Sequence, residues 1–183
     1  MNRFARTLFA LAVLCWAIPS TSAFAQPKET SKAAEGRITA ESLKTILEGL
    51  GYDITEKDEV KDTTGKVIGY SISLEKGYTF HPQITISGDQ SNLWFVFNLM
   101  AVPDPATVPS KILLGLMTAN DRIYPGYFGY YAKDNLFTMK SFMANKGLKA
   151  KDVKLQLETM GANANAYDTL WNSTKWEGSK PKD

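Results

Sequence analysis

Two stretches in the middle of the chain alternate between apolar and polar residues: VIGYSISLE at 67–75 and YTFHPQITIS at 78–87. A period of two with one polar side is typical of an antiparallel sheet that packs one face on a core. Pro82 lacks a backbone donor, which favours an edge position or a bulge for the second strand. The residues predicted to face the core are Ile68, Tyr70, Ile72 and Leu74 in the first strand, and Tyr78, Phe80, Ile84 and Ile86 in the second.

Further strands are predicted on both sides of this pair. A short strand is expected near 52–56, followed by a charged turn at 57–66. Residues 93–102 are apolar on both faces, which predicts a strand that is central in the sheet or covered twice. A hairpin is expected next, with strands at 126–132 and 136–143 on either side of the turn KDN.

Three segments have the spacing of amphipathic helices. The first begins at Thr39, a good N-cap, and ends at Gly51, which suits a left-handed stop. The second ends near Asn120, and the third covers 150–172, where Gly161 and two asparagines predict a kink. Their apolar stripes are Leu43, Ile46, Leu47 and Leu50 in the first, Ile112, Leu113, Leu116 and Met117 in the second, and Val153, Leu157, Met160, Ala164, Tyr167 and Trp171 in the third.

The predicted elements follow the order α-β-β-β(-β)-α-β-β-α. The helices must bury their stripes and the sheet offers one apolar face, so we predict an α+β fold: an antiparallel β-sheet with helices packed on one face. We expect a single domain at 38–174, preceded by a flexible lead-in at 26–37. A polar tail is expected at 175–183, and its Trp176 is apolar enough to pack against the domain.

Residues 1–25 have the pattern of a secretory signal peptide. Arg3 and Arg6 form a positive start, 7–18 form a short apolar run, and Ala23 and Ala25 place small residues at the two positions that a signal peptidase reads. A membrane-spanning helix needs about 20 apolar residues, so no stable membrane anchor is expected. We therefore expect cleavage after Ala25 and a periplasmic or secreted protein.

Charge and cysteine content narrow the chemistry further. The whole chain has 21 basic and 19 acidic side chains. Loss of Arg3 and Arg6 with the signal peptide would leave 19 basic side chains, equal to the acidic ones. A balanced surface has no charge excess for a nucleic acid backbone and no polybasic patch for anionic lipid. Loss of Cys15, the single cysteine, removes any thiol nucleophile or intramolecular disulfide.

The element order, the segment LLGLMTAND before the hairpin and the segment KGLKAKDV before the last helix resemble the YbjN family. They are also similar to its structural relative, the type III secretion chaperone fold. The likeness covers roughly residues 38–171, with Asn120 closing the second helix and KDN at the hairpin turn. This resemblance implies a non-enzymatic binding protein, often a homodimer, that holds a partner polypeptide without a nucleotide or metal. It implies no catalytic residues.

No catalytic, cofactor-binding or metal site is predicted. His81, the single histidine, falls on the polar side of its strand, and a metal site would need companion ligands at a defined spacing. A Ser-His-Asp arrangement is recognised by geometry and stays open, although the sequence has no G-x-S-x-G elbow. The acidic residues of 56–62 lack the spacing of a calcium loop, and the glycines at 126 and 129 form no nucleotide fingerprint. Asn172 begins a formal glycosylation sequon, NST.

The register of the hairpin decides which of its aromatic residues are core and which are surface. A two-residue turn at DN would pair Tyr131 with Thr138 and Gly129 with Lys140. A three-residue turn would shift the register and exchange the neighbours. We favour the first because it best separates apolar from polar side chains. It places Phe128, Tyr130, Phe137 and Met139 on the core face, and Tyr127 and Tyr131 on the other face with Thr138 and Lys140.

Displayed tyrosines offer large amphipathic contacts with few rotatable bonds, although their β-propensity alone also places them on strands. We predict Tyr127 and Tyr131, together with Tyr124, as partner-binding residues. The sequence thus favours an exported, non-enzymatic, chaperone-like domain that holds a polypeptide or a second copy of itself. One alternative is a periplasmic or secreted small-ligand-binding module, for which an enclosed aromatic pocket would be the sign. Another is a hydrolase, which would bring acidic pairs together in a cleft.

Overall fold

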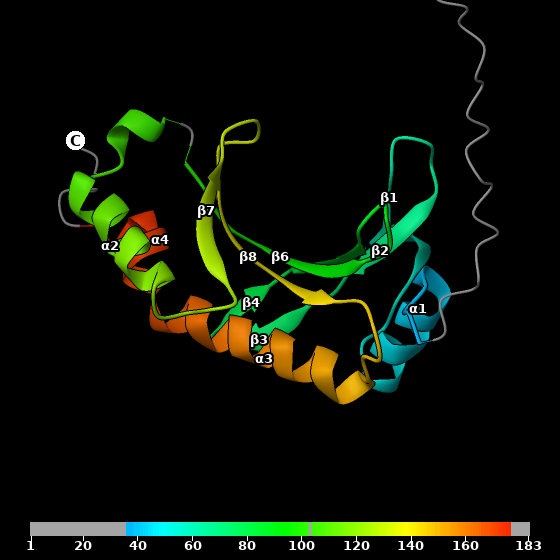
Figure 1. Cartoon of the computed structure of the whole chain (residues 1–183). Coiled ribbons are helices and arrows are strands. Elements are labelled where there is room, and N and C mark those ends of the chain that lie inside the picture. The colour runs from blue at the N-terminus through cyan, green and yellow to red at the C-terminus, as the bar shows by residue number, and fades with distance from the viewer. Residues whose placement is uncertain (1–35, 103, 177–183) are drawn as a thin grey trace, which may run out of the picture. The chain divides into compact units, whose positions relative to one another are not determined.

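A six-stranded antiparallel sheet forms the centre of the fold (Figure 1). The structure is a computed structural model and describes residues 36–102 and 104–176, so the predicted signal peptide lies outside the described residues. The predicted α+β class is confirmed. The strands of the sheet, in spatial order, are β1 (Glu59–Lys61), β2 (Val67–Ser71), β5 (Gln83–Ile86), β6 (Asn92–Ala101), β8 (Leu136–Ala144) and β7 (Tyr127–Tyr131).

Helices and a small hairpin cover one face of this sheet. Helix α3 packs on strand β3, and β4 packs on β6. No helix of the described residues lies over the opposite face of the sheet (Figure 1). The helices are α1 (Ala40–Gly49), α2 (Ser110–Asn120), α3 (Ala150–Ala166) and α4 (Asp168–Trp171), with 3-10 turns η1 (Glu56–Asp58), η2 (Pro105–Thr107) and η3 (Ser173–Lys175).

The two alternating stretches form a hairpin that is broken across both of its strands. The predicted long strands divide into β2 and β3 (Leu74–Lys76) and into β4 (Tyr78–Phe80) and β5. β2 pairs with β5 in the large sheet, whereas β3 pairs with β4 in a separate two-stranded sheet. The break lies at Pro82, which is fully buried and whose carbonyl accepts the Ile72 N–H at 3.1 Å. Pro82 was expected to put its strand at an edge or in a bulge; instead it divides that strand, and β5 lies inside the sheet between β2 and β6. Tyr70, Phe80 and Ile84 are buried as predicted.

The strand predicted near 52–56 is wrong. Residues 52–55 form no strand, and the chain then turns through η1 before β1, which lies inside the stretch predicted to be a turn. Asp58 causes this local change because its carboxylate accepts from the Thr55 N–H at 2.8 Å and the Thr55 hydroxyl at 2.7 Å. A side chain that bonds the backbone three residues away stabilises a turn at the expense of an extended strand.

The apolar stripe of the last helix is confirmed, but the predicted kink is wrong. Val153, Leu157, Met160 and Ala164 are all buried, and α3 passes through Gly161 without interruption. At Gly161 the helix lies close to strand β3: a Cβ there would lie 3.0 Å from Cγ of Lys76 and 3.2 Å from a methyl of Leu74. The helix is interrupted later, at Tyr167, where α4 begins.

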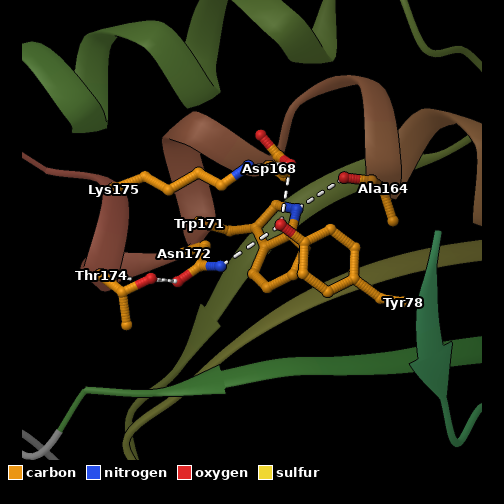
Figure 2. A network of polar contacts seen from close by, with 7 residues as sticks. All are labelled: Tyr78, Ala164, Asp168, Trp171, Asn172, Thr174 and Lys175. Carbon is orange, nitrogen blue, oxygen red and sulfur yellow. Dashed lines mark hydrogen bonds and ion pairs between the residues drawn. The ribbon is translucent and has the colours of Figure 1, made fainter.

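A polar network joins the end of the chain to strand β4 (Figure 2). The hydroxyl of Tyr78 donates to Asp168 at 2.8 Å, and Lys175 forms an ion pair with the same carboxylate. Beside them the indole N–H of Trp171 donates to the carbonyl of Ala164 at 2.7 Å, which satisfies a buried donor. Trp176, beyond this network, is buried as the sequence suggested.

Candidate functional site: the uncovered face of the sheet

The registers of β5, β6, β8 and β7 fix which side chains point away from the core. Alternate residues share a face, and the buried apolar residues of these strands define the covered one. The uncovered face therefore carries aromatic, amide and hydroxyl side chains and one charge. Its members are Gln83 and Thr85 on β5; Asn92, Trp94, Val96 and Asn98 on β6; Leu136, Thr138, Lys140 and Phe142 on β8; and Tyr127, Gly129 and Tyr131 on β7.

Trp94 and Phe142 form an aromatic pair on this face. They lie directly opposite each other on β6 and β8, with ring centroids 5.2 Å apart and an interplanar angle of 41°. Phe142 is 46% exposed, so the pair borders solvent and is not part of the core. Sequence reasoning missed this pair because residues 93–102 are apolar on both faces. The sequence did show that Trp94 and Val96 are two residues apart, which places both side chains on the same face of a strand.

Tyr127 and Tyr131 lie on the same face at the edge strand β7, on either side of Gly129. They are 38% and 42% exposed, so both side chains reach the surface. The Lys140 side chain extends toward them, with its Nζ 5.2 Å from the Tyr131 ring centroid. The predicted division of the hairpin into two faces is thus observed, with Phe128 buried on the other side.

The predicted hairpin register is wrong by two residues. Tyr131 pairs with Leu136 and Gly129 pairs with Thr138, so residues 132–135 form a longer turn than predicted. Asn135 supports the longer turn in two ways: it adopts a left-handed conformation with φ 52°, and its side chain accepts from the Tyr130 hydroxyl at 2.8 Å. A shift of two residues leaves every side chain on its face because the period of a strand is two.

The outer edge of β7 is partly closed by helix α2. The amide of Asn120 donates to the Phe128 carbonyl at 3.1 Å and accepts from the Phe128 N–H at 2.6 Å. These two bonds imitate a neighbouring strand at that residue. Open edges invite pairing with other chains, so this contact hinders the addition of a strand at that residue.

Tyr124 lies outside the six-stranded sheet, in the loop between α2 and β7. It is 90% exposed and precedes Pro125 in a cis peptide bond. The structure therefore does not place it on the face that carries Tyr127 and Tyr131. The nearby helix α2 buries Ile112 and Leu116 but exposes the other half of its predicted stripe: Leu113 and Met117 are exposed, together with Leu114.

A cavity of about 450 Å³ lies elsewhere, between the start of α1, strand β2 and the turn after β5. No aromatic side chain lines it, so it lacks the feature expected of a small-ligand module. Glu41 and Asp62 both border it, which is the kind of acidic pair a hydrolase would use. Backbone and Thr39 hydrogen bonds lower the pKa of Glu41, and the Thr64 hydroxyl and N–H lower the pKa of Asp62. Neither group has the raised pKa of a general acid.

The other two residues that the sequence singled out, His81 and Asn172, lie outside any cluster of described residues that could form a chemical site. His81 is exposed between β4 and β5, and no group of three or more potential metal ligands occurs among the described residues. Asn172 is 9% exposed; its side-chain oxygen accepts from the Thr174 N–H at 3.1 Å and its amide nitrogen donates to the Tyr78 hydroxyl at 3.4 Å. The folded state therefore holds the sequon asparagine as a cap (Figure 2). No described helix is long and apolar enough to cross a membrane.

Comparison with known proteins gives a likeness of fold. No family model matches the chain, and no curated protein matches its sequence. An uncharacterized protein from Methanothermobacter thermautotrophicus has a similar fold, with a TM-score of 0.54 and 10% identity over 76% of this chain and 100% of that one. YbjN from E. coli gives a TM-score of 0.48, with 14% identity over 70% of this chain and 92% of that one. A chain of the HopA1–SchA chaperone–effector complex gives 0.46, with 16% identity over 70% and 88%. At these identities the likeness concerns the fold alone.

Proposed function

We propose that this protein is an exported, non-enzymatic domain that binds a polypeptide partner on the uncovered face of its sheet. The observation that carries this proposal is the position of the aromatic side chains. Trp94, Phe142, Tyr127 and Tyr131 lie on an open sheet face, whereas the cavity near α1 has no aromatic lining. An open aromatic face suits an extended chain, while a small ligand needs an enclosed pocket.

The chemistry of the face also favours a polypeptide. Aromatic rings give contact area at a small entropic cost, and amide side chains such as Gln83, Asn92 and Asn98 both donate and accept hydrogen bonds. A peptide backbone offers the same two functions in return. Because Asn120 occupies the β7 edge at Phe128, the partner is expected to meet side chains and not to add a strand there.

Export is supported by the sequence of the first 25 residues. The positive start, the short apolar run and the small residues Ala23 and Ala25 favour cleavage after Ala25. We place the domain in the periplasm or outside the cell. The measurement is the N-terminal sequence of the purified exported protein. A protein that retains residues 1–25 would contradict this location.

The binding proposal is tested with an unfolded model chain. Reduced and carboxamidomethylated α-lactalbumin cannot refold and serves as the probe. The double variant Tyr127→Ser/Tyr131→Ser should keep the circular dichroism spectrum but bind this probe at least about tenfold more weakly, because two exposed aromatic contacts are lost. The matched control is Leu155→Ser, which removes an exposed apolar side chain on α3.

Two results would overturn the binding proposal. One is equal binding by the double variant and the unsubstituted protein. The other is loss of the fold in the double variant, which would place both tyrosines in the core. If the Leu155→Ser control weakens binding as much as the double variant, general surface hydrophobicity explains the binding and the assigned face is wrong.

A second copy of the chain is the other candidate partner, and helix α2 favours it. Leu114 and Met117 are 62% and 66% exposed next to the exposed Leu113, so α2 presents an apolar stripe away from its own core. Such patches commonly mark interfaces between proteins. Light scattering after size exclusion tests this partner directly. A dimer that Leu114→Glu dissociates would support it, whereas a monomer at all concentrations would remove it.

A further inference from the structure

The uncovered face has one charged side chain among β5, β6, β8 and β7. This side chain is Lys140, which lies opposite Val96 on β6 and opposite Tyr127 on β7. The remaining members of the face are aromatic, aliphatic, amide, hydroxyl or glycine residues. An ammonium group therefore lies among neutral side chains and is not part of a mixed-charge surface.

Lys140 has no acidic partner in the part of the chain that the structure describes. The ion pairs found there join other residues, and the observed contact of Lys140 is the Tyr131 ring, 5.2 Å from Nζ. A cation–π contact at an exposed site stabilises by about 0.5–1 kcal/mol and leaves the hydrogen-bond donors of the ammonium free for another group. A carboxylate would neutralise the charge of the ammonium and also accept hydrogen bonds from its N–H groups.

We infer that the polypeptide partner presents an acidic side chain flanked by apolar or aromatic ones, with the carboxylate on Lys140. This inference rests on the proposed function and specifies its partner. Charge complementarity supports it, because a basic segment would meet an unpaired cation and a purely apolar segment would leave that cation without a partner. In an extended segment every second side chain points the same way, so apolar and acidic residues spaced two apart can reach one face together.

Two synthetic peptides test the inference. The first alternates phenylalanine and aspartate, separated by serines, and the second has asparagine in place of aspartate. Both have blocked ends, so they differ only in side-chain charge. The unsubstituted protein should bind the aspartate peptide about two- to fivefold more tightly, as expected for an exposed ion pair. Added salt should reduce this preference.

Variants of two lysines locate the effect. Lys140→Gln should bind both peptides equally, whereas Lys140→Arg should keep the preference because it keeps the charge. Lys133→Gln is the matched control, since Lys133 lies in the turn of the same hairpin and is exposed. It should behave as the unsubstituted protein. A preference that survives in Lys140→Gln, or that disappears in Lys133→Gln, would place the carboxylate elsewhere and overturn the inference.

The outcomes separate the inference from the function on which it rests. Equal affinity of the unsubstituted protein for both peptides, or no binding of either, overturns the inference. If the protein still binds unfolded α-lactalbumin through Tyr127 and Tyr131, the proposed function survives that result. If α-lactalbumin binding is also absent, the proposed function fails as well.

Discussion

Replacement of Asn120 by alanine tests whether this residue closes the edge of the sheet. The side chain makes two hydrogen bonds to the backbone of Phe128, at 2.6 and 3.1 Å, in a part-buried setting. Each such bond contributes about 0.5–1.5 kcal/mol net, so their loss costs about 1–3 kcal/mol. Alanine is the better helix former at the end of α2 by about 0.5 kcal/mol, which offsets a small part of this cost.

Urea unfolding measures the difference. We expect Asn120→Ala to lower the free energy of unfolding by about 0.5–2.5 kcal/mol, the value that remains after the helix-propensity gain. The matched control is Asn98→Ala, since Asn98 is exposed on the uncovered face and its side chain makes no hydrogen bond to another described residue. It should change stability by less than about 0.5 kcal/mol. Equal stabilities of the two variants would refute the assigned role of Asn120.

The same substitution has a second consequence. Loss of the Asn120 contact exposes the N–H and carbonyl of Phe128 at the β7 edge. The backbone groups of alternate residues in a strand point the same way, so those of Phe128 then join those of Tyr130 along this edge. An open edge recruits other strands. We expect Asn120→Ala to associate as its concentration rises in light scattering, under conditions where Asn98→Ala does not. A variant that is destabilised but does not associate would limit the role of Asn120 to stability.

Two further substitutions test other parts of the fold. At Gly69 a Cβ would collide with the Ile84 carbonyl oxygen and lie 2.7 Å from Cα of Thr85. Gly69→Ala should therefore lower the free energy of unfolding, measured with urea, by at least about 3 kcal/mol. A smaller loss would mean that β2 and β5 can move apart. Hydrogen bonds from the Lys175 ammonium and the Tyr78 hydroxyl lower the pKa of Asp168 in the folded protein. The ionised carboxylate therefore stabilises the fold at any pH above its unfolded pKa of about 3.9, and this contribution is lost as the pH falls through the lower folded pKa. Asp168→Asn should remove this component from a pH series of unfolding curves, and an unchanged acid limb would contradict the assignment.

Much of the fold follows from periodicity because burial imposes it. The apolar residues of α3 recur at helical spacing and those of the alternating strands recur at every second position. The structure confirms that these residues face the core. The break at Pro82 was foreseen only as an irregularity, since the sequence does not show that β3 and β4 leave the main sheet. The strand predicted near 52–56 failed because Asp58 bonds to Thr55, a local contact that β-propensity ignores.

The candidate site was predictable in part, and the reason is geometric. Alternation along β7 suffices to display Tyr127 and Tyr131, and a register error of two residues did not alter that result. The Trp94–Phe142 pair depends on the registration of β6 with β8, which joins segments far apart in sequence. Tyr124 is close to Tyr127 in sequence, but it precedes the strand and therefore does not share its face.

A protein that keeps an aromatic sheet face open must prevent its own copies from pairing on it indiscriminately. Both edges of the sheet are protected: Asn120 occupies β7, and β1 is a three-residue strand that carries an ion pair between Glu59 and Lys61 at 3.0 Å and a register irregularity. With main-chain pairing hindered at both edges, the proposed binding to the face would depend mainly on side chains. Lys140 is the one cation that β5, β6, β8 and β7 carry on this face, and it would favour an acidic partner over a second copy of the same face, which would bring another Lys140 with it. Under the proposed function, edge protection and Lys140, which has no acidic partner among the described residues, together favour a foreign segment over association of the sheets.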